Sequence, residues 1–184
     1  MNRKETTKFL SDLLISEKFG GVGKYWAREV SIDPFHSKDS TLSKRVDFMQ
    51  FVPEGQSTVS AIEKGIFICY EVKSCKDDVY SGNGLNFLGE KNYIVTTMEC
   101  YKDILYDINN GFLDKHIEKV SGKHRYYGII VAVPEDREEF EEYITPTPLG
   151  SEKRWKLKTM IPCHAQLREK SMTELLFCML RSGR

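Results

Sequence analysis

The chain lacks the features that would assign it at once to a membrane, secreted or disulfide-rich class. Its 184 residues contain no apolar run of 18, so the sequence predicts no membrane-spanning helix and no membrane partner. The N-terminus has no apolar stretch of the kind found in signal peptides. The five cysteines form no Cys-x-x-Cys pair, which argues against a disulfide framework or a zinc cage and favours the reducing cytoplasm.

An excess of charge of either sign is also absent. The 27 basic and 27 acidic residues give a formal net charge of zero, which argues against a strongly basic, non-specific DNA-binding protein. The sequence has no Walker-type phosphate-binding motif. None of its four histidines has the spacing of a metal ligand: His36, His116, His124 and His164. An enzyme that gathers positive charge on one rim is still compatible with this composition.

The apolar patterns that are present predict an α/β protein. Strands are expected over residues 25–32, 44–52, 65–74, 92–97 and 126–133, with helices over 5–18, over 99–109 and after Ser171. We therefore expect a mixed central sheet of about five strands, flanked by helices. Residues 1–134 would form this core. Residues 135–184 would be a C-terminal extension whose amphipathic helix packs on the same domain.

The tripeptide Glu71-Val72-Lys73 carries the strongest chemical signal, because it ends the most hydrophobic predicted strand. Residues two apart on a strand share a face, so Glu71 and Lys73 are expected to point the same way. Asp47 lies in the preceding predicted strand, and pairing of the two strands would bring a second carboxylate within reach. Two carboxylates beside an ammonium suit Mg²⁺, which generates hydroxide and neutralises a phosphodiester in its transition state.

These residues, with the order of the predicted elements, resemble the PD-(D/E)xK nuclease superfamily, which has a restriction-endonuclease-like core. The resemblance covers roughly residues 5–133 and departs from the family's name at Val46, where that name has a dispensable proline. Residues 83–93 also look like the segment that follows Glu-x-Lys in some members. The resemblance implies Mg²⁺-dependent hydrolysis of DNA phosphodiester bonds, with Mn²⁺ able to substitute.

The same resemblance implies a role for each matching residue. Asp47, Glu71 and the carbonyl group of Val72 would hold the metal, and Lys73 would orient the attacking water or stabilise charge on the phosphate. The family often adds an acid from its first helix or first strand, for which Glu17 and Glu29 are the candidates, with Glu29 able to point inward. Four further residues could contact the substrate: Ser74, Lys76, Lys91 and Tyr93.

Three functions are compatible with the sequence. The first is a DNA nuclease that acts alone, as a homodimer or with a protein partner. The second is a non-catalytic protein of the nuclease fold that binds nucleic acid or a protein. The third is an unrelated α/β interaction protein, in which the triplet is a coincidence and Asp47 lies far from Glu71. An exposed salt bridge at the end of a sheet is the plain structural interpretation, worth about 0–1 kcal/mol.

Overall fold

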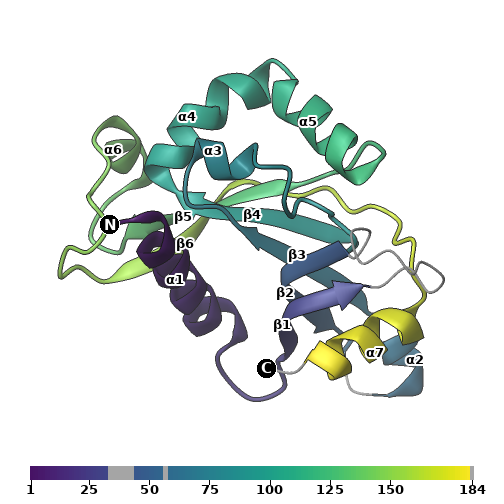
Figure 1. Cartoon of the computed structure of the whole chain (residues 1–184). Helices are drawn as coiled ribbons and strands as arrows, with labels where there is room; N and C mark the ends of the chain where they lie inside the picture. Colours follow the sequence, from purple (N-terminus) through teal and green to yellow (C-terminus); the bar gives the residue numbers. More distant parts are fainter. Residues whose placement is uncertain (33–43, 56–57, 183–184) are drawn as a thin grey trace.

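A mixed β-sheet forms the centre of the fold, and its six strands lie side by side in chain order (Figure 1). The computed structural model describes residues 1–32, 44–55 and 58–182. The expected α/β class, with a mixed sheet flanked by helices, is confirmed, but the expected count of about five strands is wrong. The strands are β1 (Tyr25–Ile32), β2 (Lys44–Val52), β3 (Ile66–Val72), β4 (Lys91–Thr97), β5 (Gly128–Pro134) and β6 (Trp155–Ile161).

The pairing of the strands changes direction twice across the sheet. β1, β2 and β3 pair antiparallel, β4 pairs parallel with both β3 and β5, and β6 pairs antiparallel with β5. Parallel neighbours need long crossover connections, which here carry helices. The helices are α1 (Arg3–Leu14) with the π-helical turn η1 (Ile15–Phe19), α2 (Val59–Glu63), α3 (Lys76–Val79), α4 (Met98–Asn109), α5 (Phe112–Ser121), α6 (Glu139–Ile144) and α7 (Met172–Ser182).

The sixth strand, β6, lies in a region where the sequence shows no clear periodicity. Trp155 and Leu157 are buried, at 8% and 9% exposure, while Lys156 and Lys158 between them carry the strand's charge. This alternation is short and is interrupted by polar residues, so it is weaker than the continuous apolar runs of β3 and β5. β6 therefore completes the sheet from within residues 135–184, and α7 packs against β1 at the other end of the sheet.

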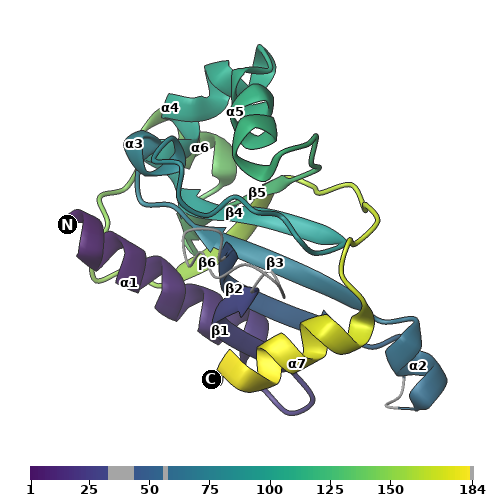
Figure 2. The ribbon, with the colours of Figure 1, turned by 45° about the vertical axis from the view of Figure 1, so that its right-hand side comes forward.

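Different helices cover the two faces of the sheet. On one face α1 and η1 pack on Tyr70 and Val72 of β3. On the other face α7 packs near Cys69, and α4 and α5 pack near Ile94 of β4. Figures 1 and 2 show α4 and α5 lying beside each other, well away from α7. Because side chains alternate along β3, and because Glu71 is paired with Ile94, Glu71 lies between the α7 and α4–α5 clusters.

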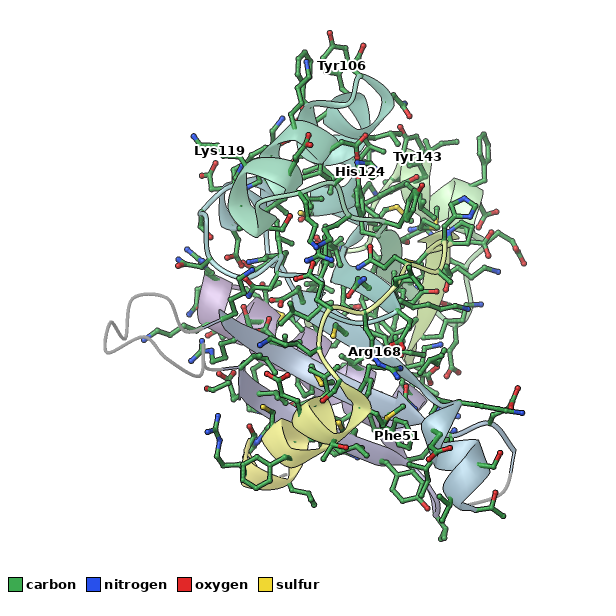
Figure 3. All side chains as sticks on the ribbon, turned by 90° about the vertical axis from the view of Figure 1, so that its right-hand side faces the viewer. Phe51, Tyr106, Lys119, His124, Tyr143 and Arg168 are labelled. Carbon is green, nitrogen blue, oxygen red and sulfur yellow. The ribbon has the colours of Figure 1, made fainter. Side chains whose placement is uncertain are left out.

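Helices α4, α5 and α7 each bury one side in these two clusters and expose their other side to solvent. Figure 3 shows Phe51 beside α7, while Tyr106 and Lys119 project from α4 and α5 at the far end. Phe51 is 5% exposed, whereas Tyr106 is 67% exposed. No helix in the described part of the chain combines the length and the apolar character needed to cross a bilayer. His36 lies outside the described residues.

The N-terminal helix begins with a capping box, in which each side chain satisfies an amide of the other residue. Asn2 accepts a hydrogen bond from the amide of Glu5 at 3.0 Å, and Glu5 accepts one from the amide of Asn2 at 2.9 Å. Asn2 and Glu5 have the three-residue spacing that a capping box requires. The α-helix ends at Leu14, however, and the predicted helical stretch continues as η1.

Candidate active site

Asp47 reaches β3 at the point where the main-chain pairing of β2 and β3 ends. The last pair is Phe48 with Tyr70, and beyond it the Asp47 Oδ2 atom accepts a hydrogen bond from the Val72 amide at 2.9 Å. The carboxylate thus satisfies an amide that would otherwise lack a strand partner. The two strands pair, which is the condition under which the sequence brings Asp47 within reach of the triplet. The Asp47 carboxylate is hydrogen-bonded to the amide that follows Glu71 in the chain, and its charge raises the pKa of Glu71.

Glu71 is the most deeply buried carboxylate of this group. Glu71 is 1% exposed, and its Oε1 atom has no hydrogen-bond partner among the described residues. Burial raises its pKa well above the usual value and Asp47 raises it further, while the Lys73 charge and a hydrogen bond from the Leu85 backbone lower it. A buried oxygen without a partner costs about 1–3 kcal/mol, so a cation at this place would relieve a real energetic penalty.

Lys73 is fixed at both its main chain and its side chain. Its amide donates to the carbonyl oxygen of Val95 at 2.9 Å, and its carbonyl oxygen accepts from Thr96 Oγ1 at 2.6 Å. Its Nζ atom donates to the carbonyl oxygen of Asn83 at 2.6 Å, and the residue is 4% exposed. The ammonium is therefore held beside Glu71 in a setting that excludes bulk water.

Asp47 has a similar environment, although it is less enclosed. Burial raises its pKa, whereas the hydrogen bond from Val72 and the Lys73 charge lower it. Like charge on two neighbouring carboxylates is unfavourable unless a cation neutralises it, and here Lys73 supplies one positive charge. A divalent ion would supply more, with oxygen ligands of the kind that Mg²⁺ prefers.

Residues 81–88, which we name the covering segment, close over these groups. Gly84 has φ of +72°, and a Cβ atom there would overlap Glu71 Oε2 and lie 3.3 Å from Lys73 Nζ. Leu85 and Phe87 also have positive φ, at 57° and 48°, which is rare for large side chains. Residues 83–88 belong to the segment that resembles the stretch after Glu-x-Lys, but none of them was expected in the site. The pair of glycines soon after the triplet, Gly82 and Gly84, is the sequence signal for the covering segment.

Asp78 of α3 is a third acid near the site that sequence reasoning missed. Its Oδ2 atom accepts hydrogen bonds from the amide and the hydroxyl of Ser74, each at 3.0 Å. Its Oδ1 atom forms an ion pair with Arg3 of α1. The charge of Asp78 also raises the pKa of Asp47, which places it within electrostatic range. Asp78 is the third residue of α3, a helix of four residues, which is too short to show a periodic pattern in the sequence.

The two acids that we considered for the third position lie elsewhere. Glu29 has φ of 53° and interrupts the pairing of β1 with β2; its side chain, 56% exposed, pairs with Arg45 at 2.9 Å. The Arg45 charge also lowers the pKa of Asp47. Glu17 is exposed on η1, on the α1 side of the sheet. Neither of them joins the buried carboxylates.

The structure does not bring the four expected substrate contacts to the Glu71 carboxylate. Ser74 is bound to Asp78, and Lys76 pairs with Asp107 at 2.8 Å. Tyr93 stacks on Tyr70 with ring centroids 5.8 Å apart, on the face that α1 covers. Lys91 precedes it by two residues on β4 and shares that face.

A metal site here would consist of two carboxylates and a main-chain carbonyl. In residues 1–32, 44–55 and 58–182, no cluster of three or more His, Cys, Asp or Glu side chains is arranged around a common centre. Asp47, Glu71 and the Val72 carbonyl still offer only oxygen donors, and Glu71 Oε1 accepts no hydrogen bond from the part of the chain that the structure describes. This donor set fits a hard cation. Comparison of the chain with protein-family models, curated proteins and solved structures found no match.

The close approach of Gly84 to Glu71 predicts a specific cost for a methyl group. Gly82→Ala and Gly84→Ala both place alanine at positive φ, +77° and +72°, which costs about 1–2 kcal/mol each. Only Gly84→Ala also meets Glu71, because nothing lies within 4 Å of a Cβ at Gly82. We expect urea unfolding to show Gly84→Ala less stable than Gly82→Ala by about 1–3 kcal/mol. Equal free energies of unfolding for the two variants would show that Gly84 does not approach Glu71 closely in solution.

Proposed function

We propose that this chain is a metal-dependent nuclease of the PD-(D/E)xK type, with a restriction-endonuclease-like core, which hydrolyses DNA phosphodiester bonds. The observation that carries the proposal is the buried Oε1 atom of Glu71, which has no hydrogen-bond partner among the described residues, on a side chain whose pKa Asp47 raises and Lys73 lowers. A structural salt bridge alone would leave no reason for an unpaired carboxylate oxygen in the interior. The mixed sheet, which presents these residues on paired strands, is consistent with such a core.

Each residue of the site has a defined task under this proposal. Asp47, oriented by the Val72 amide, and Glu71 would hold Mg²⁺ together with the Val72 carbonyl, and Mn²⁺ would substitute. When bound, the metal would activate water and polarise the phosphate. Lys73 would donate hydrogen bonds to phosphate oxygens as their negative charge grows. Its fixed main chain means that little reorganisation is needed at that step.

A second candidate is a protein of the same fold that binds nucleic acid or a protein without turnover. The burial of Glu71 and Lys73, at 1% and 4% exposure, favours it. A phosphodiester cannot touch either group while the covering segment keeps its place. The two candidates differ in an observable way, because only the nuclease should release cut DNA when metal is added.

The experiment that tests the proposal is cleavage of labelled linear, circular, single-stranded and branched DNA with Mg²⁺ or Mn²⁺. We expect cutting of at least one substrate, which EDTA abolishes and which falls about 100-fold or more in Asp47→Asn. Asp77→Asn is the matched control, because Asp77 is an exposed acid on the nearby α3. Cutting that survives in Asp47→Asn would assign the activity to another site. DNA binding without any cutting would favour the second candidate.

A further inference from the structure

Residues 81–84, the exposed first half of the covering segment, form a turn that we name the closing turn. Ser81, Gly82 and Asn83 are exposed and Gly84 is half-buried, whereas residues 85–88 are buried. The hydrogen bond that ties the closing turn to the site runs from Lys73 Nζ to the Asn83 carbonyl oxygen, at 2.6 Å. The Lys73 ammonium, which the proposed reaction needs as a donor to phosphate, thus donates to a main-chain oxygen instead.

The second half of the covering segment is held by contacts outside the site. Phe87 stacks on Tyr127 with ring centroids 5.9 Å apart, and Gln166 Nε2 donates to the Phe87 carbonyl oxygen at 2.9 Å. Asn86 Nδ2 donates to the carbonyl oxygen of Arg45 at 2.8 Å. These contacts anchor the second half of the covering segment, so a displacement would fall on the closing turn. Gly82 and Gly84 flank Asn83, and glycine crosses between backbone conformations at little steric cost.

The Asn83 carbonyl lies where an anionic oxygen would bind more strongly. The ammonium already forms a charge-assisted hydrogen bond with the carbonyl oxygen, and a phosphate oxygen in the same place adds the attraction between two opposite full charges. Because Lys73 is 4% exposed, a phosphate can reach its Nζ atom only after the closing turn moves away. The two oxygens therefore compete for the same donor.

We propose that the Asn83 carbonyl oxygen marks the position of a phosphate oxygen of the substrate, and that a bound phosphodiester displaces the closing turn from Lys73. This inference rests on the proposed function. It assigns the structure described above to the closed, substrate-free state. It also explains how a buried Glu71 and Lys73 can belong to an enzyme that acts on a polymer.

A spin label on the closing turn tests the inference in the full-length chain. The nitroxide is attached through Asn83→Cys in a Cys75→Ser background, because Cys75 is half-buried and the other four cysteines are buried. The same label at Glu54→Cys, on a turn after β2, is the control. The probes are a 20-base-pair duplex and dimethyl phosphate, each added with EDTA or with Ca²⁺, and fluorescence anisotropy measures duplex binding separately.

We expect either probe to shorten the rotational correlation time of the label at position 83 by about two-fold or more, with no change at position 54. In Lys73→Met the label should be mobile from the start and respond to neither probe. Duplex binding that leaves the label unchanged, or immobilises it further, would overturn the inference and leave the nuclease proposal standing. If dimethyl phosphate mobilises the label at position 83 but the duplex does not bind, the competition for Lys73 is supported and DNA is disfavoured as the substrate. A label that is already mobile in the unliganded chain would also overturn it.

Discussion

Replacing Glu71 with glutamine is expected to abolish metal binding and cleavage while making the metal-free protein more stable at neutral pH. The variant keeps the shape of the side chain and removes its charge, so the desolvation of a buried carboxylate disappears. We expect a gain of about 1–3 kcal/mol in the free energy of unfolding at pH 8. We also expect cleavage to fall about 1,000-fold or more, since the metal contributes several kcal/mol and each 1.4 kcal/mol is tenfold.

The gain in stability should depend on pH in a direction that follows from the pKa of Glu71. Its pKa is raised in the folded state, so the folded protein binds more protons than the unfolded chain at pH values above about 4.5. The stability that protonated Glu71 contributes is therefore complete below that pH and is lost as the pH rises through the folded pKa. Glu71→Gln should match the wild type near pH 4 and exceed it increasingly toward pH 8.

Metal should narrow the difference in stability at pH 8 and reverse it where the gain from Glu71→Gln is below about 2.7 kcal/mol. Mg²⁺ or Mn²⁺ at about 100 times its dissociation constant should stabilise the wild type by about 2.7 kcal/mol and leave Glu71→Gln unchanged. Urea unfolding with and without EDTA, together with calorimetric titration of Mn²⁺, measures both effects. Glu63→Gln, an exposed acid on α2, is the matched control and should behave as the wild type. If Glu71→Gln proved less stable in EDTA at pH 8, Glu71 would be a structural partner of Lys73.

The sequence predicted the parts of the site that lie on regular strands. Alternation along the strand expected over residues 65–74 placed Glu71 and Lys73 on one side, and both side chains do approach Gly84, although β3 itself ends at Val72. Pairing of the two strands was the condition for bringing Asp47 near, and β2 and β3 do pair. The bounds of β1 and β2 also agree with the structure. Such patterns are readable because a strand buried in a sheet must repeat its side-chain environment every two residues.

The parts that could not be predicted depend on loops and on long-range packing. The sequence of residues 81–88 has no periodicity that reveals the close approach of Gly84 to Glu71, or the hydrogen bond between Lys73 and the Asn83 carbonyl oxygen. Both contacts depend on the path of the main chain through a turn. Glu29 looked like an inward-pointing strand residue by alternation. Its positive φ breaks that alternation and turns the side chain to Arg45, a local change that no repeat of period two can reveal.

Substituting Lys73 with methionine is expected to separate metal binding from catalysis. Methionine keeps much of the length of the lysine side chain but lacks its positive charge. In the wild type that charge lowers the pKa of both Asp47 and Glu71. A cation at the carboxylates is repelled by that ammonium, so Mn²⁺ affinity at pH 8 should stay the same or rise by up to about tenfold. Cleavage should nevertheless fall about 100-fold to 1,000-fold, because the charge on the transferred phosphate loses its donor.

Lys76→Met is the matched control for this experiment, since Lys76 is three residues further along and pairs with Asp107 on the protein surface. It should retain cleavage within about threefold, because an exposed ion pair contributes only about 0–1 kcal/mol. Calorimetry with Mn²⁺ and single-turnover cleavage, both at pH 8, give the two quantities for each variant. Parallel loss of metal affinity and cleavage in Lys73→Met would mean that Lys73 maintains the geometry of the carboxylates. Loss of cleavage alone would place its ammonium on the substrate, where the Asn83 carbonyl oxygen now lies.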